Sequence, residues 1–420
     1  MRSGGDIAGA VAERVARASY GKLIAFLAAR TGDVAAAEDA LSEAFAAALH
    51  DWPAGGVPDS PEAWLMAVAR RRMIDASRRR RHADAAADHL RLLAAELDAA
   101  TADSAFPDNR LGLMFACAHP AIDPGIHAPL MLQTILGFDA ATIASAFLVA
   151  PATMGQRLVR AKVKIRGAGI PFRVPEASEL RPRLDAVLGA IYAIFAEGWC
   201  DPLGTETRRR NLADEGIWLG RLVTALLPDE AEALGLLALM LLQDARRAAR
   251  VDARGDLVTL ENQDRSQWDR KAIDEGVALL DAALRRERPG PYQVQAAIAA
   301  CHATAATPAD TDWHEIAGLY RELSAMTRSP VVELNRAVAV AMADGPEAGL
   351  SIVASIEDAG ELRGYHLLPA AKADFLRRLG RRGEAVAAYQ EALALTASES
   401  EQRYLRRRLD EVRSPTARAT

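Results

Sequence analysis

The segment Thr142–Arg166 places the strongest constraint on the fold, because it has the pattern of two short helices joined by a tight turn. Apolar residues at helical spacing predict the inner faces of both helices: Ile143, Ala146 and Phe147 in the first, and Leu158, Val159, Val163 and Ile165 in the second. A helix-turn-helix presents its second helix to the major groove of DNA. The residues predicted to point outward are those that contact bases and phosphates, namely Thr153, Gln156, Arg157, Arg160, Lys162 and Lys164. The alternative is a solvated face on an ordinary helical bundle.

A second basic segment lies upstream, from Trp64 to His82. It is an apolar helical stripe that ends in seven arginines among the twelve residues from Arg70 to Arg81. A stripe that packs on one side leaves these guanidinium groups in water, where a polyanion can bind them. Although a single run of charge is usually a solvated surface, two such segments in one chain favour contact with nucleic acid.

The order of these parts resembles the bacterial sigma-70 family initiation factors of the extracytoplasmic-function type. Ala37–Leu49 resembles the helix that binds the clamp of core RNA polymerase, which assigns that role to Glu38, Asp39, Glu43 and Phe45. Trp64–Arg79 resembles the helix that opens and reads the proximal promoter element, which implies contacts by Arg70, Arg71, Arg72, Asp75, Arg78 and Arg79. Asn109–Ile170 resembles the module that reads the distal element, and its outward residues are those named above.

Two positions depart from the family pattern. Arg71 stands where the promoter-reading helix usually has Asn, and Ser42 stands where the polymerase-binding helix commonly has Gln. The resemblance therefore predicts the mode of binding, and it leaves the base preference at the proximal element open.

The rest of the chain resembles the helical C-terminal extension of the subgroup with tetratricopeptide-like repeats. Leu237–Trp268, Ser329–Met342 and Gly364–Leu368 carry this resemblance. Near the end, Ala385, Tyr389 and Ala392 have the small-large-small spacing of a repeat's second helix. Concave repeat surfaces usually bind peptides or other domains, so a protein or small-molecule regulator is expected here.

The expected fold is all-α, with four parts along the chain. Residues 1–83 form sigma region 2, 84–107 a linker, 108–172 a region 4 helix-turn-helix, and 183–414 the TPR-like extension. Because the two promoter elements lie several turns apart on DNA, flexible joints between the modules are expected. Within the extension, Asp244–Trp268 is predicted to contain a short hairpin and an ion-pair network, with a ligand pocket as the alternative.

Composition excludes several other classes. The net charge is −5, yet residues 1–175 hold 20 Lys and Arg against 18 Asp and Glu, so the acidic excess lies in the extension. The three cysteines have no CxxC spacing, which gives no sign of a disulfide framework or zinc site. Catalytic motifs and phosphate loops are absent from the sequence, so no enzyme activity, cofactor or metal is expected. No apolar run is long enough to span a bilayer, and a cytoplasmic protein is expected.

The predicted function is that of a sigma factor that directs promoter-specific transcription initiation and is modulated by its extension. Its partners are then core RNA polymerase and promoter DNA. Two other classes stay open: a one-component helix-turn-helix regulator with a helical sensor domain, and a TPR-type scaffold that binds no DNA.

Overall fold

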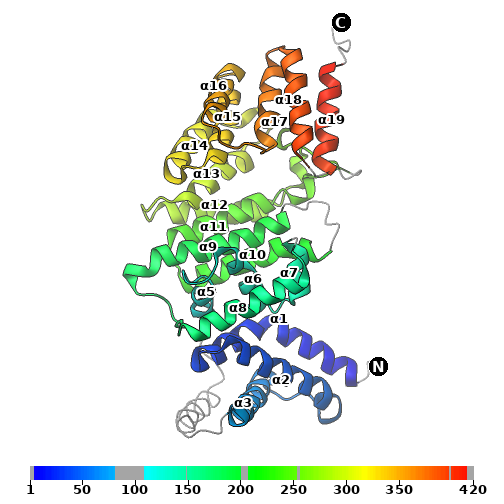
Figure 1. The fold of residues 1–420 in the computed structure, drawn as a ribbon, viewed down its shortest axis with the longest axis vertical. Coiled ribbons are helices and arrows are strands. Elements are labelled where there is room, and N and C mark those ends of the chain that lie inside the picture. Colours follow the sequence, from blue (N-terminus) through cyan, green and yellow to red (C-terminus); the bar gives the residue numbers. More distant parts are fainter. Residues whose placement is uncertain are drawn as a thin grey trace. The chain divides into compact units, whose positions relative to one another are not determined.

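The computed structural model describes residues 4–80, 108–147, 149–199, 207–252, 256–396 and 399–413. Their regular elements are helices joined by turns and loops, and an antiparallel bridge pairs Val251 with Leu257 (Figure 1). The all-α prediction is confirmed. The chain divides into two compact units, Met1–Glu197 and Gly198–Thr420. The predicted linker at 84–107 lies outside the described residues.

The N-terminal unit contains eight described helices. They are α1 (Gly4–Thr31), α2 (Val34–Gly55), α3 (Pro61–Arg80), α5 (Arg110–Cys117), α6 (Pro124–Thr134), α7 (Ala140–Ala146), α8 (Pro151–Gly167) and most of α9 (Ala177–Trp199). Local chemistry sets several of their starts. The Asp33 carboxylate caps α2 by accepting from the amide of Ala36, Asp139 caps α7 in the same way, and Pro151 begins α8.

A stretch of α1 and nearly all of α5 are buried on every side. Six consecutive residues of α1, Leu23 to Ala28, are at most 1% exposed, and residues 111–117 of α5 are all buried. A helix buried on every side needs packing partners on opposite faces. For α1 these partners are α2 and α3 on the one hand and α5 on the other. The segments predicted as regions 2 and 4 therefore share one apolar core.

The C-terminal unit is a succession of helices from α10 onward. They are α10 (Thr207–Leu226), α11 (Ala231–Asp244), α12 (Arg270–Leu284), α13 (Pro291–Thr304), α14 (Trp313–Thr327), α15 (Pro330–Ala343), α16 (Pro346–Asp358), α17 (Leu367–Arg378), α18 (Arg382–Leu395) and α19 (Glu399–Arg413). Most of them pack chiefly against helices that neighbour them in the chain, as the antiparallel pairs in Figure 1 show, whereas α13 packs chiefly against α11. Contacts between helices close in sequence make the stability of such a unit approximately a sum of local terms.

Small residues let these pairs approach closely. A Cβ at Gly349 of α16 would lie 2.6 Å from the Cβ of Ala341 and 2.8 Å from the carbonyl oxygen of Ala337, both on α15. Ala385, Tyr389 and Ala392 of α18 are at most 2% exposed, in the core that α17, α18 and α19 share. The predicted small-large-small packing of this helix is present.

The segment between α11 and α12 is an irregular excursion, residues 245–269. It holds short 3-10 turns at Arg247–Ala249, Leu260–Asn262 and Arg265–Gln267. The predicted hairpin is reduced to the bridge between Val251 and Leu257, and its tip, residues 253–255, lies outside the described residues.

Candidate nucleic-acid and polymerase interface

The helix-turn-helix pattern corresponds to α7 and α8, and the burial of α8 differs from the predicted inner face. The residues in the core are Met154, Leu158, Ala161 and Ile165, at most 6% exposed. Val159 and Val163 are 58% and 51% exposed, so their assignment to the inner face was wrong. The spacing explains this outcome, because positions 154, 158, 161 and 165 follow one helical stripe and the two valines lie beside it.

Four of the six predicted distal-element residues form one exposed stripe along α8. Thr153, Gln156, Arg160 and Lys164 are spaced by three, four and four residues and are all exposed. Neighbours at this spacing share a helix face. The stripe combines an amide, a hydroxyl and two cations, the groups that contact base edges and phosphates in a major groove.

Arg157 points away from this stripe, toward α6. Its guanidinium donates to the carbonyl oxygen of Gly125 at 3.2 Å and lies 3.7 Å from the Asp123 carboxylate. These contacts hold α8 against the start of α6. In this conformation Arg157 supports the position of α8.

Lys162 differs most from its predicted role. Its Nζ is 2.5 Å from Oε2 of Glu38 on α2, and the two side chains are only 10% and 12% exposed. Both were predicted to be surface contacts, Lys162 to DNA and Glu38 to polymerase. The structure pairs them with each other instead, because α8 packs on α2 within the shared core. Burial raises the pKa of Glu38, although the neighbouring ammonium opposes this shift.

A second ion pair joins the same two helices. Nη1 of Arg166 donates to Oδ2 of Asp33 at 3.1 Å, with side chains 52% and 15% exposed. The other carboxylate oxygen of Asp33 caps α2. Sequence reasoning selected neither residue, since nothing local to either position indicates the other.

The rest of the predicted polymerase-binding face of α2 lies in solvent. Asp39 and Glu43 are exposed and Phe45 is half-buried. Leu49 is 55% exposed, whereas Leu41 is fully buried in the core. An exposed apolar side chain beside carboxylates is suited to docking on a basic and apolar surface.

The predicted proximal-element helix is α3, next to α2. Arg71, Arg72 and Asp75 are exposed and Arg70 is half-buried. Nε of Arg72 lies 3.3 Å from the Glu43 carboxylate, which links α3 to α2. The side chains of Arg78 and Arg79 lie outside the described residues. Trp64 packs edge-on against the buried Trp52, with ring centroids 5.5 Å apart, in keeping with a core role.

In the C-terminal unit, arginines rather than internal ion pairs fasten the excursion. The Arg250 guanidinium lies 3.8 Å from the centroid of the Trp199 ring and donates to the Trp199 carbonyl. Arg265 donates at 2.7 Å to the carbonyls of both His302 and Ala305. Asp256 pairs with Arg403 of α19 at 2.8 Å. Arg247 pairs with Asp244 at 2.5 Å and with Asp214 of α10 at 2.8 Å. Ion pairs thus join the segment to other helices, as the predicted network requires.

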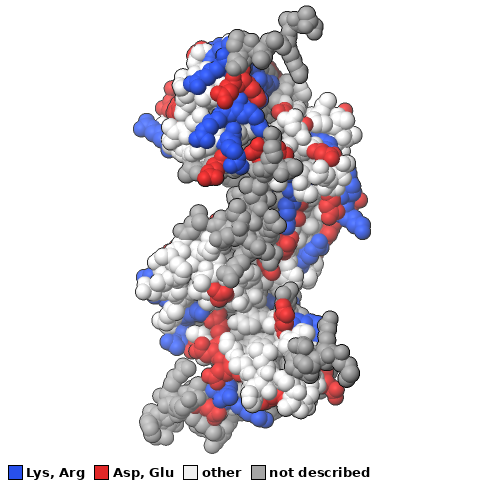
Figure 2. Space-filling model, turned by 90° about the vertical axis from the view of Figure 1, so that its right-hand side faces the viewer, with Lys and Arg blue, Asp and Glu red and all other residues white. Residues whose placement is uncertain are grey.

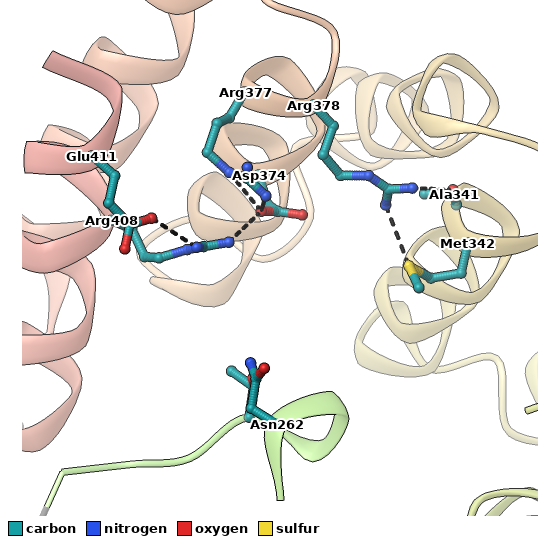
Figure 3. Close-up of polar contacts among 9 residues, drawn as sticks. Asn262, Ala341, Met342, Asp374, Arg377, Arg378, Arg408 and Glu411 are labelled. Carbon is teal, nitrogen blue, oxygen red and sulfur yellow. Dashed lines mark hydrogen bonds and ion pairs between the residues drawn. The ribbon is translucent and has the colours of Figure 1, made fainter. Parts of the chain in front are cut away.

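A cleft of about 290 Å³ lies between this excursion and α19. Thr259 and Asn262 line one side, and Tyr404, Arg407 and Arg408 line the other. Figure 3 shows Arg408 held between Asp374 and Glu411, with Asn262 facing this group from the excursion. On the face in Figure 2, the basic and acidic side chains of the last helices are interspersed. The cleft therefore offers both signs of charge beside an aromatic ring.

In the part of the chain that the structure describes, no group of His, Cys, Asp and Glu is arranged to hold a metal ion. The thiol of Cys117 is buried 3.4 Å from the Thr134 hydroxyl, and burial raises its pKa to about 12. Among the same residues, no helix combines the length and apolar character that a bilayer span requires.

Comparison with known proteins identifies the class. Residues 15–83, which contain α2 and α3, match the model of sigma-70 region 2, and residues 183–284 match a family of unknown function, DUF6596. The N-terminal part of the chain thus contains a sigma-70 region 2 domain, which supports a sigma-70 family factor. The chain belongs to one family with an uncharacterized protein of Rhizobium meliloti (strain 1021), with 44% identity over 391 residues, or 91% of each chain. No solved structure matches it.

Proposed function

We propose that this protein is a sigma factor of the extracytoplasmic-function type that directs RNA polymerase to specific promoters. The observation that carries the proposal is the pairing of two surfaces in the N-terminal unit. One is the acidic and apolar face of α2 within the sigma-70 region 2 domain. The other is the exposed polar stripe of α8, which suits a DNA groove.

In the proposed complex, Asp39, Glu43, Phe45 and Leu49 dock on basic and apolar helices of core polymerase. Rim charges steer the encounter and the apolar centre holds it. Arg70, Arg71 and Arg72 then engage the proximal element, together with Asp75, Arg78 and Arg79. Bases that leave the duplex there are held by stacking and by phosphate neutralisation.

The stripe of Thr153, Gln156, Arg160 and Lys164 binds the distal element in this scheme. Gln156 and Arg160 have the geometry for paired hydrogen bonds to base edges, and Lys164 neutralises a phosphate. Lys162 joins them only after it leaves Glu38. The protein is proposed to act in the cytoplasm, to carry out no catalysis itself and to need no cofactor.

The C-terminal unit is proposed to be a TPR-like regulatory module. The cleft between the excursion and α19 is where a protein or small-molecule regulator would bind, because Arg407 and Asn262 offer hydrogen-bond donors beside Tyr404. Substitution of both Arg407 and Asn262 by Ala should change promoter output while polymerase binding is kept. Unchanged output under inducing and non-inducing conditions would count against a regulatory cleft.

The function itself is tested by co-purification with core polymerase, followed by run-off transcription on a promoter library. A sigma factor binds polymerase and programmes initiation at a defined set of promoters. A one-component regulator would bind duplex DNA without polymerase, and a scaffold would do neither. Either of these two results would refute the proposal.

A further inference from the structure

We propose that the cleft between the excursion and α19 binds a free α-amino acid with an apolar side chain. The ammonium group of the ligand pairs with Glu261 on one wall, and its carboxylate pairs with Arg407 on the other. This ligand class deepens the regulatory cleft of the proposed function and rests on it, although the binding itself is measured on the protein alone.

The two walls of the cleft are braced by contacts within the protein. Nε of Arg403 on α19 lies 2.8 Å from Oδ1 of Asp256, which ties the helix to the excursion. On the excursion, the side-chain amide of the buried Gln263 donates to the carbonyl of Val258 at 3.2 Å. A cleft that is already formed has little to order when a ligand enters, so less binding free energy is lost there.

Three of the five charged side chains that line the cleft are engaged by the protein itself. Arg408 lies 2.8 Å from Glu411 and 3.3 Å from Asp374, so carboxylates balance its charge on two sides (Figure 3). Asp252 accepts a hydrogen bond from the backbone amide of Asp256 at 2.9 Å. These groups shape the walls of the cleft.

The other two charges have opposite signs and lie on opposite walls. Glu261 and Arg407 are exposed, and neither forms an ion pair or a hydrogen bond among the residues that the structure describes. Both lie near Tyr404. The Arg407 guanidinium is 5.6 Å from the centroid of the Tyr404 ring. Burial chiefly raises the pKa of the Tyr404 hydroxyl, and the negative charge of Glu261 adds to this shift.

Helical spacing explains why Arg407 faces the excursion. Arg403 and Arg407 are four residues apart on α19, and side chains at this spacing share a helix face. Arg403 finds a carboxylate in Asp256, whereas the described part of the excursion offers Arg407 none at pairing distance. The cation is therefore directed at the cleft by the same face that braces it.

A zwitterion satisfies both of these charges at once. A simple anion bound at Arg407 would face the carboxylate of Glu261, and a simple cation bound at Glu261 would face the guanidinium of Arg407. Charge-assisted hydrogen bonds of about 2.7–2.9 Å at both ends are open only to a molecule that carries both signs.

The size and lining of the cleft narrow the class further. Its volume of about 290 Å³ lies at the small end of ligand sites, which span roughly 300–1,000 Å³. Leu257, Val258 and the ring of Tyr404 add apolar surface to the same cleft. An α-amino acid with an aliphatic or aromatic side chain combines both charges with one apolar group, and so it matches this lining.

Isothermal titration calorimetry on the full-length protein tests this inference, with L-leucine and L-phenylalanine as probes. Each probe is compared with two analogues that lack one charge. Isoamylamine and phenethylamine have no carboxylate, and isocaproate and hydrocinnamate have no ammonium group. At least one of the amino acids should bind. Removal of either charge should weaken its binding about tenfold, because one charge-assisted hydrogen bond is lost and the facing charge stays unpaired.

Two variants assign each charge of the ligand to its partner. Arg407→Gln should weaken binding of the amino acid about tenfold without weakening binding of the amine, which has no carboxylate to lose contact. Glu261→Gln should weaken the amino acid by a similar factor without weakening the carboxylate analogue. Arg406→Gln and Glu391→Gln are matched controls at exposed side chains outside the cleft, and they should leave every affinity unchanged. Circular dichroism checks that all four variants keep their helical content.

The outcomes separate this inference from the proposed function. The amino-acid site is refuted if neither amino acid binds, if a one-charge analogue binds as tightly as its parent, or if the controls weaken binding as much as the cleft variants. The polymerase and transcription assays then decide the sigma-factor function independently. If the amino acid binds as expected but the protein does not associate with core polymerase, the proposed function is refuted and the site stands.

Discussion

The two units of this molecule are built by different rules. In the N-terminal unit, residues from distant parts of the sequence share a core, and α1 packs against partners on opposite faces. In the C-terminal unit, helices pack on others one or two places away in the chain. Local packing makes stability nearly additive along the chain, whereas segments that share one core depend on each other for burial of their apolar residues. The comparison therefore predicts that a core substitution acts locally in the second unit and on both segments in the first.

The largest effect is expected from Tyr389→Ala in the C-terminal unit. The side chain is 2% exposed in the core shared by α17, α18 and α19, so its removal should lower the free energy of unfolding by about 3–5 kcal/mol. Hydrogen exchange should show a loss of amide protection in those helices and not in the N-terminal unit. Leu395→Ala, at a side chain 40% exposed, is the control and should change little. An equal loss of protection in both units would contradict modular packing.

Acid should weaken the C-terminal unit through His302. Burial and the nearby Arg246 and Arg265 lower the pKa of His302 to about 4. Between pH 6.5 and pH 4, His302 is protonated in the unfolded state but not in the folded state. The free energy of unfolding therefore falls as the pH drops from 6.5 toward 4. The shift corresponds to a loss of up to about 3 kcal/mol. Urea unfolding of wild type and His302→Gln across this range measures it, and parallel curves for the two proteins would exclude His302 as the cause.

The shared core is tested at Gly21. Alanine usually stabilises a helix relative to glycine, but a Cβ here meets the backbone of Ile135. Gly21→Ala should therefore destabilise the N-terminal unit by about 1–3 kcal/mol or separate its two segments. Gly9→Ala on the same helix, where nothing lies within 4 Å, should instead stabilise it by about 0.5–1 kcal/mol. Thermal unfolding measures the change in stability of each variant. If Gly21→Ala stabilises the protein as Gly9→Ala does, α1 has no close partner at Gly21.

The smallest effect is expected at Val163, the residue whose predicted burial was wrong. Val163→Ser should change the free energy of unfolding by no more than about 0.5 kcal/mol, because the side chain is 51% exposed. Ala161→Ser, two residues away and 6% exposed, should cost more. Chemical denaturation of the two variants distinguishes the faces, and a larger loss at Val163 would restore the original assignment.

Local patterns predicted much of this structure, and long-range pairings escaped them. The helical stripe of α8 and the arginine helix α3 follow from spacing that is visible in the sequence. The exception is the inner face of α8, to which Val159 and Val163 were wrongly assigned. The partnership of Lys162 with Glu38 could not be inferred, because 124 residues separate them and either charge alone indicates an exposed side chain. One signal was available: the unbroken apolar runs from Leu23 to Ala28 and from Leu111 to Ala118 contain no polar face and so imply partners on several sides.

The fully enclosed stretch of α1 also decides which fragments of this protein can be handled in solution. A recombinant fragment that ends before residue 81 would keep α2 and α3 but lack α5, which packs on the opposite side of Leu23–Ala28. An apolar surface of α1 would then be exposed to water. Such a piece is expected to self-associate at concentrations where the longer chain stays monodisperse. A piece that ends at Trp199, the last residue of α9, keeps α5 beside α1 and contains the whole N-terminal unit.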